Sequence, residues 1–96
     1  MPHINDYTGK RVHMIGIGGS SMSGLAGMLA QLGIRVTGSD SARSYMTDTL
    51  TGQGISVSSG HRAENVDGAD LVVYSAAIHP DNPERARASQ LGIPQM

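Results

Sequence analysis

The fold of this chain is decided by one stretch, Met14-Ile15-Gly16-Ile17-Gly18-Gly19-Ser20-Ser21-Met22-Ser23-Gly24. An apolar run over residues 12–17 leads into it, and a pattern typical of a helix follows over residues 22–32. This order predicts a strand, a tight glycine turn and a helix whose first backbone N–H groups have no partner within the helix. Those groups and the helix dipole attract anions, and glycine lets the backbone approach them closely. The stretch therefore predicts a site for a phosphorylated ligand such as a nucleotide.

Strand-like and helix-like segments alternate along the rest of the chain. Strands are predicted at residues 11–17, 34–40, 55–57 and 70–75, with the start of a fifth at 93–96, and helices at 22–32, 41–50 and 83–91, with one helical turn at 62–66. The last helix begins with Asn82 as N-cap, Pro83 at the first position and Glu84 near the positive end, and it stops at Gly92. Gly24 and Gly27 suggest that the first helix packs closely on the sheet or near a ligand.

This alternation predicts the α/β class. We expect a Rossmann-like parallel sheet of about four to five strands flanked by helices, in a single small domain over residues 1–96. Because the pattern stops on a strand, we expect either the front piece of a longer protein or a minimal form of one domain.

Composition and charge argue against several classes of function. Hydrophobic residues make up 39% and charged residues 16%, as in ordinary soluble globular proteins. A net charge of −1, with three Tyr and no Phe or Trp, gives no reason to expect nucleic acid. No segment approaches the roughly 20 apolar residues of a membrane span. The absence of cysteine excludes disulfides and thiolate metal sites and agrees with a cytoplasmic location.

The glycine stretch is one residue short of the dinucleotide fingerprint G-x-G-x-x-G, since it reads Gly16-x-Gly18-x-x-Ser21. Asp40 follows Gly16 by 24 residues, close to where the fingerprint places a carboxylate that accepts from ribose hydroxyls. Two simpler interpretations stay open: the glycines only permit a tight turn, and residues 39–41 cap the next helix. We expect the loop to bind phosphate, with its serines donating to phosphate oxygens or capping the helix.

Three further residues follow predicted strand ends, where open α/β sheets bind ligands: His61, Ser75 and Ala77. His61 either contacts the ligand or is an ordinary hydrogen-bonding loop residue. The small residues 75–77 could admit a flat base or simply turn the chain. The sequence has no G-x-x-x-x-G-K-[ST] loop, no set of nucleophile, base and orienting residue, and no metal-ligand spacing. We therefore expect no catalytic and no metal-binding residues here.

Five separated motifs, in order, carry a resemblance to one family. They are residues 13–26 (HMIGIGGSSMSGLA), Gly38-Ser39-Asp40, Gly60-His61 with residues 63–66 (AENV), residues 73–78 (VYSAAI) and residues 81–84 (DNPE). Together they resemble the N-terminal domain of the UDP-N-acetylmuramate–L-alanine ligases, the Mur ligases that add the first amino acid in peptidoglycan synthesis. The resemblance covers nearly the whole chain. Ser21 departs from it, because the family often has glycine there, and this leaves the detailed pyrophosphate contacts open.

The resemblance implies a cytoplasmic three-domain enzyme of cell-wall biogenesis: this Rossmann-like domain, a central ATPase and a C-terminal domain for the amino acid. Such an enzyme uses ATP and magnesium to join L-alanine to the lactyl carboxylate of UDP-N-acetylmuramate through an acyl phosphate. The residues that it implies for the UDP sugar are Gly16, Gly18, Gly19, Ser20, Ser21 and Met22 in the loop at the pyrophosphate, and Asp40, His61, Ser75 and Ala77 around the uridine. ATP and magnesium would bind in the other domains, so we expect no cofactor here.

Three alternatives remain open. The tripeptide-recycling murein ligase shares the architecture, but its loop typically has a different, cysteine-containing start. An NAD-binding module of a dehydrogenase or a regulatory nucleotide sensor would explain the glycines and Asp40, but not His61 or Asn82-Pro83. A structural or interaction domain would leave the turn empty. The expected partners are UDP-N-acetylmuramate and the other domains of the same chain, with no nucleic acid and no membrane.

Overall fold

The computed structural model describes residues 4–96, so the first three residues of the predicted domain lie outside the described residues. In chain order the elements are η1 (Ile4–Tyr7), β1 (Arg11–Ile15), α1 (Ser20–Gln31), β2 (Arg35–Asp40), α2 (Tyr45–Gly52), β3 (Ser56–Ser59), η2 (Ala63–Val66), β4 (Leu71–Tyr74) and α3 (Pro83–Leu91), where η denotes a 3₁₀ helix. The alternation of strands and helices confirms the α/β class.

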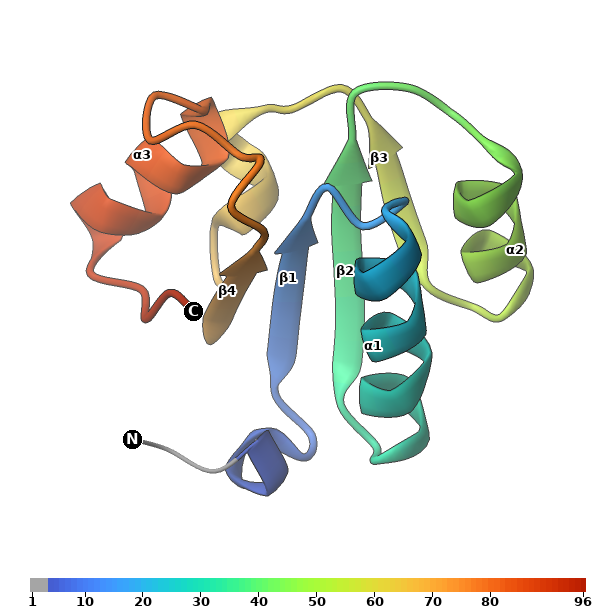
Figure 1. The fold of residues 1–96 in the computed structure, drawn as a ribbon. Coiled ribbons are helices and arrows are strands. Elements are labelled where there is room, and N and C mark those ends of the chain that lie inside the picture. Colours follow the sequence, from blue (N-terminus) through green and yellow to red (C-terminus); the bar gives the residue numbers. More distant parts are fainter. Residues whose placement is uncertain (1–3) are drawn as a thin grey trace.

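The four strands form one parallel sheet in the order β3-β2-β1-β4 (Figure 1). Successive side chains of a strand point to opposite faces. Val12 and Met14 of β1 pack with α1 and α2, whereas Ile15 packs on the other face with η2 and α3. The sheet is therefore covered on both faces, as the apolar character of its central strands predicts.

Residues 93–96 lie beside β4 and confirm the predicted start of a fifth strand as a short parallel bridge. The N–H of Val72 donates to Pro94 O at 2.9 Å, and the N–H of Met96 donates to Val72 O at 2.9 Å.

The strand order β3-β2-β1-β4 runs outward from β1 in both directions. Parallel sheets bind ligands at such a switch point, outside the carboxyl ends of the strands. This edge is at the top of Figure 1.

β1 ends at Ile15, two residues earlier than predicted, because Gly16 turns the chain. Gly16 has φ +79°, in the left-handed region that favours glycine. The N–H groups of Gly16 and Ile17 both donate to Ser39 O, at 2.8 and 3.0 Å, and so tie the turn to β2. The buried Ile17 side chain lies against Gly38, where an added Cβ would come within 2.5 Å of it.

α2 begins at Tyr45 instead of residue 41, because Ser44 is its N-cap. Ser44 Oγ accepts the Thr47 N–H at 3.3 Å, while Thr47 Oγ1 accepts the Ser44 N–H at 2.8 Å. This reciprocal pair satisfies two N–H groups at the helix start. The alternative in which residues 39–41 cap this helix is therefore wrong.

The start and end of α3 are confirmed. Asn82 Oδ1 accepts the Glu84 N–H at 2.9 Å with Pro83 at the first helical position, and Gly92 ends the helix in the left-handed conformation. Gly24 and Gly27 were expected to let α1 pack closely on the sheet, and that prediction is wrong. A Cβ at Gly24 would meet nothing within 4 Å, and one at Gly27 would meet only a side chain following α2, at 4.0 Å.

Candidate functional site

The start of α1 presents three backbone N–H groups without a partner. Its N-cap is Gly19, which has no side chain to satisfy them, and the first intrahelical bond runs from Ser23 N–H to Gly19 O at 2.8 Å. Within the described part of the chain, the N–H groups of Ser20, Ser21 and Met22 make no hydrogen bond. The start of α1 lies at the carboxyl edge of the sheet (Figure 1). Three free donors at the positive end of a 12-residue helix can bind an anion.

Asp40, at the end of β2, is tied to the glycine loop. Its Oδ2 accepts the Gly18 N–H at 2.8 Å. A Cβ at Gly18 would lie 2.8 Å from the same oxygen and 3.0 Å from Thr47 Cγ2. Gly18 is therefore required by the approach of a carboxylate of the protein itself. Among the described residues the other oxygen, Oδ1, has no hydrogen-bond partner, so it can accept from a ligand hydroxyl.

A buried carboxylate, Glu84 of α3, lies beneath this edge. It is fully buried and accepts four hydrogen bonds: His13 Nε2 at 2.6 Å and Ser39 Oγ at 2.7 Å on Oε1, and Arg62 N at 3.0 Å and Asn65 Nδ2 at 3.1 Å on Oε2. Burial acts to raise the pKa of Glu84, but the hydrogen bonds favour the ionised form and bring its pKa down to about 2. The single carboxylate joins α3 to β1, β2 and η2.

Sequence reasoning missed this role of Glu84. The residue belongs to the motif of residues 81–84 and was expected only as an acidic residue at the positive end of a helix. Its hydrogen-bond donors lie 19 to 71 residues away in the chain. No local pattern signals such a contact. The one available sequence signal was the coincidence of His13, Ser39 and Asn65 in the other motifs of the resemblance.

His61 touches the buried carboxylate and also reaches the surface. Its Nδ1 lies 3.0 Å from Ser39 Oγ and 3.4 Å from Glu84 Oε2, and its side chain is 19% exposed. The preceding Gly60 donates its N–H to Asp40 O at 2.6 Å. His61 is thereby held next to the end of β2, on the same edge as the glycine loop.

The segment after β4 borders the same loop. A Cβ at Gly16 would lie 3.1 Å from Ile78 Cδ1, so the Ile78 side chain reaches the glycine turn. Arg85 of α3 holds this segment: Nη1 donates to Ile78 O at 2.7 Å and Nη2 to Tyr74 Oη at 3.0 Å, with the guanidinium 3.9 Å from the Tyr74 ring centre. Ser75 is half-buried and Ala77 is exposed. All four groups of predicted residues therefore meet at one edge.

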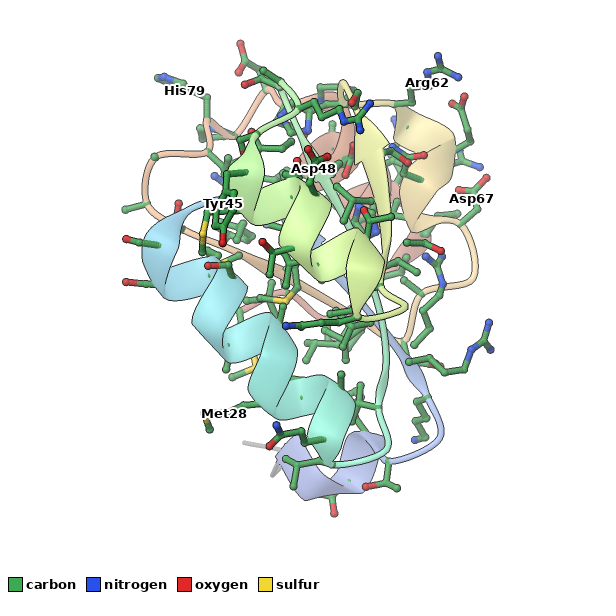
Figure 2. The ribbon with its side chains drawn as sticks, turned by 90° about the vertical axis from the view of Figure 1, so that its right-hand side faces the viewer. Met28, Tyr45, Asp48, Arg62, Asp67 and His79 are labelled. Atoms are coloured by element: carbon green, nitrogen blue, oxygen red, sulfur yellow. The ribbon has the colours of Figure 1, made fainter. Side chains whose placement is uncertain are left out.

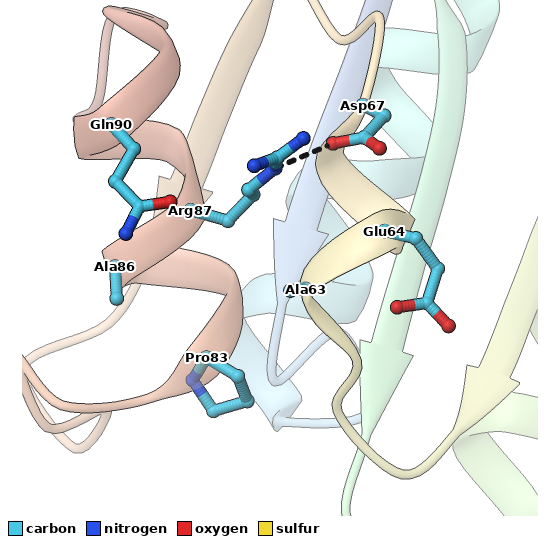
Figure 3. Close-up of a pocket in the computed structure, with 7 residues that line it drawn as sticks. All are labelled: Ala63, Glu64, Asp67, Pro83, Ala86, Arg87 and Gln90. Carbon is cyan, nitrogen blue, oxygen red and sulfur yellow. Dashed lines mark hydrogen bonds and ion pairs between the residues drawn. The ribbon is translucent and has the colours of Figure 1, made fainter.

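Two open pockets between helices lie largely away from this edge. A cavity of about 430 Å³ lies between η2 and α3, lined by Ala63, Glu64, Asp67, Pro83, Ala86, Arg87 and Gln90, with Arg87 Nε 3.0 Å from Asp67 Oδ1 (Figure 3). A second, of about 380 Å³, lies between α1 and α2. Of the predicted site residues, only Ser20 lines either cavity. Figure 2 shows this helical face, where Met28 and Tyr45 point away from the sheet. The candidate site is thus an open edge of the sheet.

Two further observations concern cofactors and membranes. Across residues 4–96, no cluster of three or more His, Asp or Glu side chains is arranged to hold a metal ion. None of the helices described is both long enough and apolar enough to span a bilayer.

The sequence matches a known family model, described as "Mur ligase family, catalytic domain", over residues 11–96. A curated relative, the UDP-N-acetylmuramate–L-alanine ligase of Acetivibrio thermocellus, is 55% identical over 87 residues, which are 91% of this chain and 19% of the relative. The chain therefore spans about a fifth of the length of that relative.

Solved structures of similar ligases also match this chain. The UDP-N-acetylmuramate–alanine ligase of Thermotoga maritima matches with a TM-score of 0.86 and 35% identity, over 90% of this chain and 20% of that one. The UDP-N-acetylmuramate:L-alanyl-γ-D-glutamyl-meso-diaminopimelate ligase of Neisseria meningitides matches with a TM-score of 0.83 and 32% identity, over 91% of this chain and 28% of that one. The described sheet and its helices are thus those of a Rossmann-like ligase domain.

Proposed function

The chain belongs to the Mur ligase family, and on that premise we propose that it binds the UDP portion of UDP-N-acetylmuramate for an L-alanine-adding ligase. The 55% identity to a ligase of this name favours the L-alanine-adding member. Among the solved structures the difference is small, since the alanine ligase is 35% identical and the ligase of the tripeptide-recycling type is 32% identical.

The observation that carries the proposal is the set of three free N–H groups at the start of α1, flanked on the same edge by Asp40 and His61. A pyrophosphate offers oxygens that accept from Ser20, Ser21 and Met22, and the helix dipole stabilises its charge. Gly16 and Gly19 shape the turn, and Gly18 admits the Asp40 carboxylate.

The uridine would occupy the neighbouring strand ends. Asp40 Oδ1 accepts from a ribose hydroxyl, because Oδ2 is already bonded to Gly18. His61 lies beside the base, and the small residues Ser75 and Ala77 leave room for its flat ring. The exposed Ser21 directs its side chain to solvent, so its Cβ does not disturb the packing of α1.

The rest of the reaction belongs to other domains in this proposal. The larger enzyme would use ATP and magnesium to join L-alanine to the sugar's lactyl carboxylate in cytoplasmic peptidoglycan synthesis. The described residues fit neither group: they form no cluster for a metal ion, and the chain has no G-x-x-x-x-G-K-[ST] loop. We therefore derive no step of the ATP chemistry from this chain and assign it binding alone.

Calorimetric titration of the chain with UDP-N-acetylmuramate, UDP and NAD in parallel tests the proposal. We expect heat of binding for the two uridine ligands and none for NAD. Binding of NAD with no response to either uridine ligand would establish the nucleotide-sensor or dehydrogenase-module alternative. A chain that binds none of the three would favour the structural alternative.

A further inference from the structure

The hydrogen-bond partners of Ser39 determine which nitrogen of His61 carries the proton. The Ser39 hydroxyl has a single hydrogen, and it is directed to Glu84 Oε1 at 2.7 Å, because a carboxylate can only accept. Toward His61 Nδ1, at 3.0 Å, Ser39 Oγ can therefore only accept. The hydrogen of this contact must come from His61 Nδ1.

Glu84 reinforces the same assignment from the other side. Its Oε2 lies 3.4 Å from His61 Nδ1, and a bare nitrogen lone pair facing a buried carboxylate would be repelled. The charge of Glu84 is already stabilised by donors from His13, Arg62 and Asn65. A neutral His61 with the hydrogen on Nδ1 satisfies every one of these contacts.

In the neutral ring the other nitrogen, Nε2, is then a bare acceptor. Among the described residues, Nε2 has no hydrogen-bond partner. Because it is not one of the buried polar atoms left without a partner, it is accessible to solvent. It is the ring atom left for solvent or a ligand, on the edge that also carries Asp40 Oδ1.

We propose that Glu84 and Ser39 hold His61 in the Nδ1–H tautomer, so that its Nε2 accepts the imide N–H of a uracil base. This inference rests on the proposed function and names what selects the base. Uracil presents an N–H at its ring position 3, whereas cytosine presents a bare nitrogen that would face the Nε2 lone pair. Glu84 and Ser39 act through His61 and are positioning residues.

The tautomer is measured without any ligand. In ¹⁵N NMR of the unmodified chain, we expect the His61 Nδ1 shift of a protonated nitrogen and the Nε2 shift of a bare one. A proton on Nε2, alone or on both nitrogens, overturns the proposal. Because this experiment needs no variant, a folding failure cannot obscure it.

The positioning role is measured by the same spectrum in variants. Glu84→Gln replaces an acceptor by a group that can donate to Nδ1, so we expect His61 to shift toward the Nε2–H tautomer. Glu64→Gln, on an exposed residue of η2, is the matched control and should leave the spectrum unchanged. If Glu84→Gln does not fold, Ser39→Ala provides the second variant and should produce a measurable Nε2–H population. An unchanged tautomer in every folded variant overturns the positioning role.

Base selection is measured by titration with UDP and CDP. We expect UDP to bind at least about tenfold more tightly than CDP, and His61→Ala to reduce that ratio to about one. Equal binding of UDP and CDP by the unmodified chain overturns the claim that His61 selects uracil, while leaving the proposed function intact. Binding of neither ligand overturns both, and a ratio unchanged in His61→Ala assigns the selection to another residue.

Discussion

Asp40 has two roles that lie on different oxygens of one carboxylate. Oδ2 accepts the Gly18 N–H and so positions the glycine loop, while Oδ1 is left for a ligand. The sequence motif placed a carboxylate at this position for a ribose, but the contact with Gly18 became evident only in the folded chain. A single residue thereby connects the sugar end of the proposed site to its phosphate end.

Replacing Asp40 by Ala tests the ligand contact. We expect Asp40→Ala to weaken UDP binding about tenfold or more, since a hydrogen bond to a charged group contributes roughly 1.5–3 kcal/mol. The chain should stay folded, because only one internal hydrogen bond is lost. Calorimetry measures the affinity and circular dichroism the fold. Asp48→Ala, on the exposed side of α2 (Figure 2), is the control; equal affinity of the two variants would remove Asp40 from the site.

Glu84 predicts how stability depends on pH. Its pKa is lowered to about 2 in the folded chain, from 4.5 for an unperturbed group, so the folded state favours the ionised carboxylate. The stabilisation is fully present above about pH 4.5 and is lost as the pH falls toward 2, by up to roughly 3 kcal/mol. Urea unfolding from pH 6 to pH 2 measures it.

The Glu84→Gln variant provides the comparison for that experiment. It should be less stable at pH 6, because a buried hydrogen-bond network is broken, and its stability should fall less between pH 4.5 and 2. The Glu64→Gln control should follow the unmodified chain. A Glu84→Gln curve with the full acid dependence would assign that dependence to other carboxylates.

At the scale of elements, a glycine of β2 and a glycine of α1 differ in whether packing requires them. Gly38 lies in β2 where the Ile17 side chain occupies the space of a Cβ, 2.5 Å away. Gly24 lies within α1 with nothing within 4 Å, so no packing requires it. The helix period and the strand pattern predicted both elements, but they suggested a packing role for Gly24, which has none, and not for Gly38.

This difference predicts opposite effects of the same substitution. Gly38→Ala should destabilise the chain by about 1–3 kcal/mol, because the added methyl group displaces a fully buried side chain. Gly24→Ala should stabilise it by about 0.5–1 kcal/mol, since alanine loses less backbone entropy in a helix. Chemical denaturation measures both, and each variant is the other's control. Equal effects of the same sign would contradict the packing described for Gly38.

At the scale of the whole molecule, the site exists only because distant segments meet at one edge. The strand order brings the loop after β1 between the ends of β2 and β4, and α3 supplies the carboxylate beneath them. Ligand binding should therefore stabilise the entire domain and not one element.

Thermal unfolding tests that coupling. A ligand that binds only the folded chain adds about 2.7 kcal/mol at one hundred times its dissociation constant. For a domain of this size each kcal/mol corresponds to roughly 4–8 °C in the unfolding midpoint. We expect the midpoint to rise with UDP concentration and to stay constant with NAD. A rise with NAD alone would contradict the proposed ligand.

Much of this protein was predictable from local patterns. The apolar runs, the glycine loop and the caps Asn82 and Gly92 gave the α/β class, the parallel sheet and both ends of α3, because such signals act between residues that are neighbours in the chain. The same patterns misplaced the start of α2, because several serines in residues 39–44 are equally able to cap a helix.

The sequence by itself thus determined the strands and the α-helices in their order, apart from the start of α2, and the loop from Gly16 to Met22 that opens α1. Only the tertiary structure decided that the Gly18 N–H is taken by Asp40, and that Glu84 is a buried acceptor whose contacts orient His61. The physical reason is distance along the chain. Helix caps and strand patterns are set within a few residues, whereas burial of a charge depends on four donors that folding gathers from three other segments.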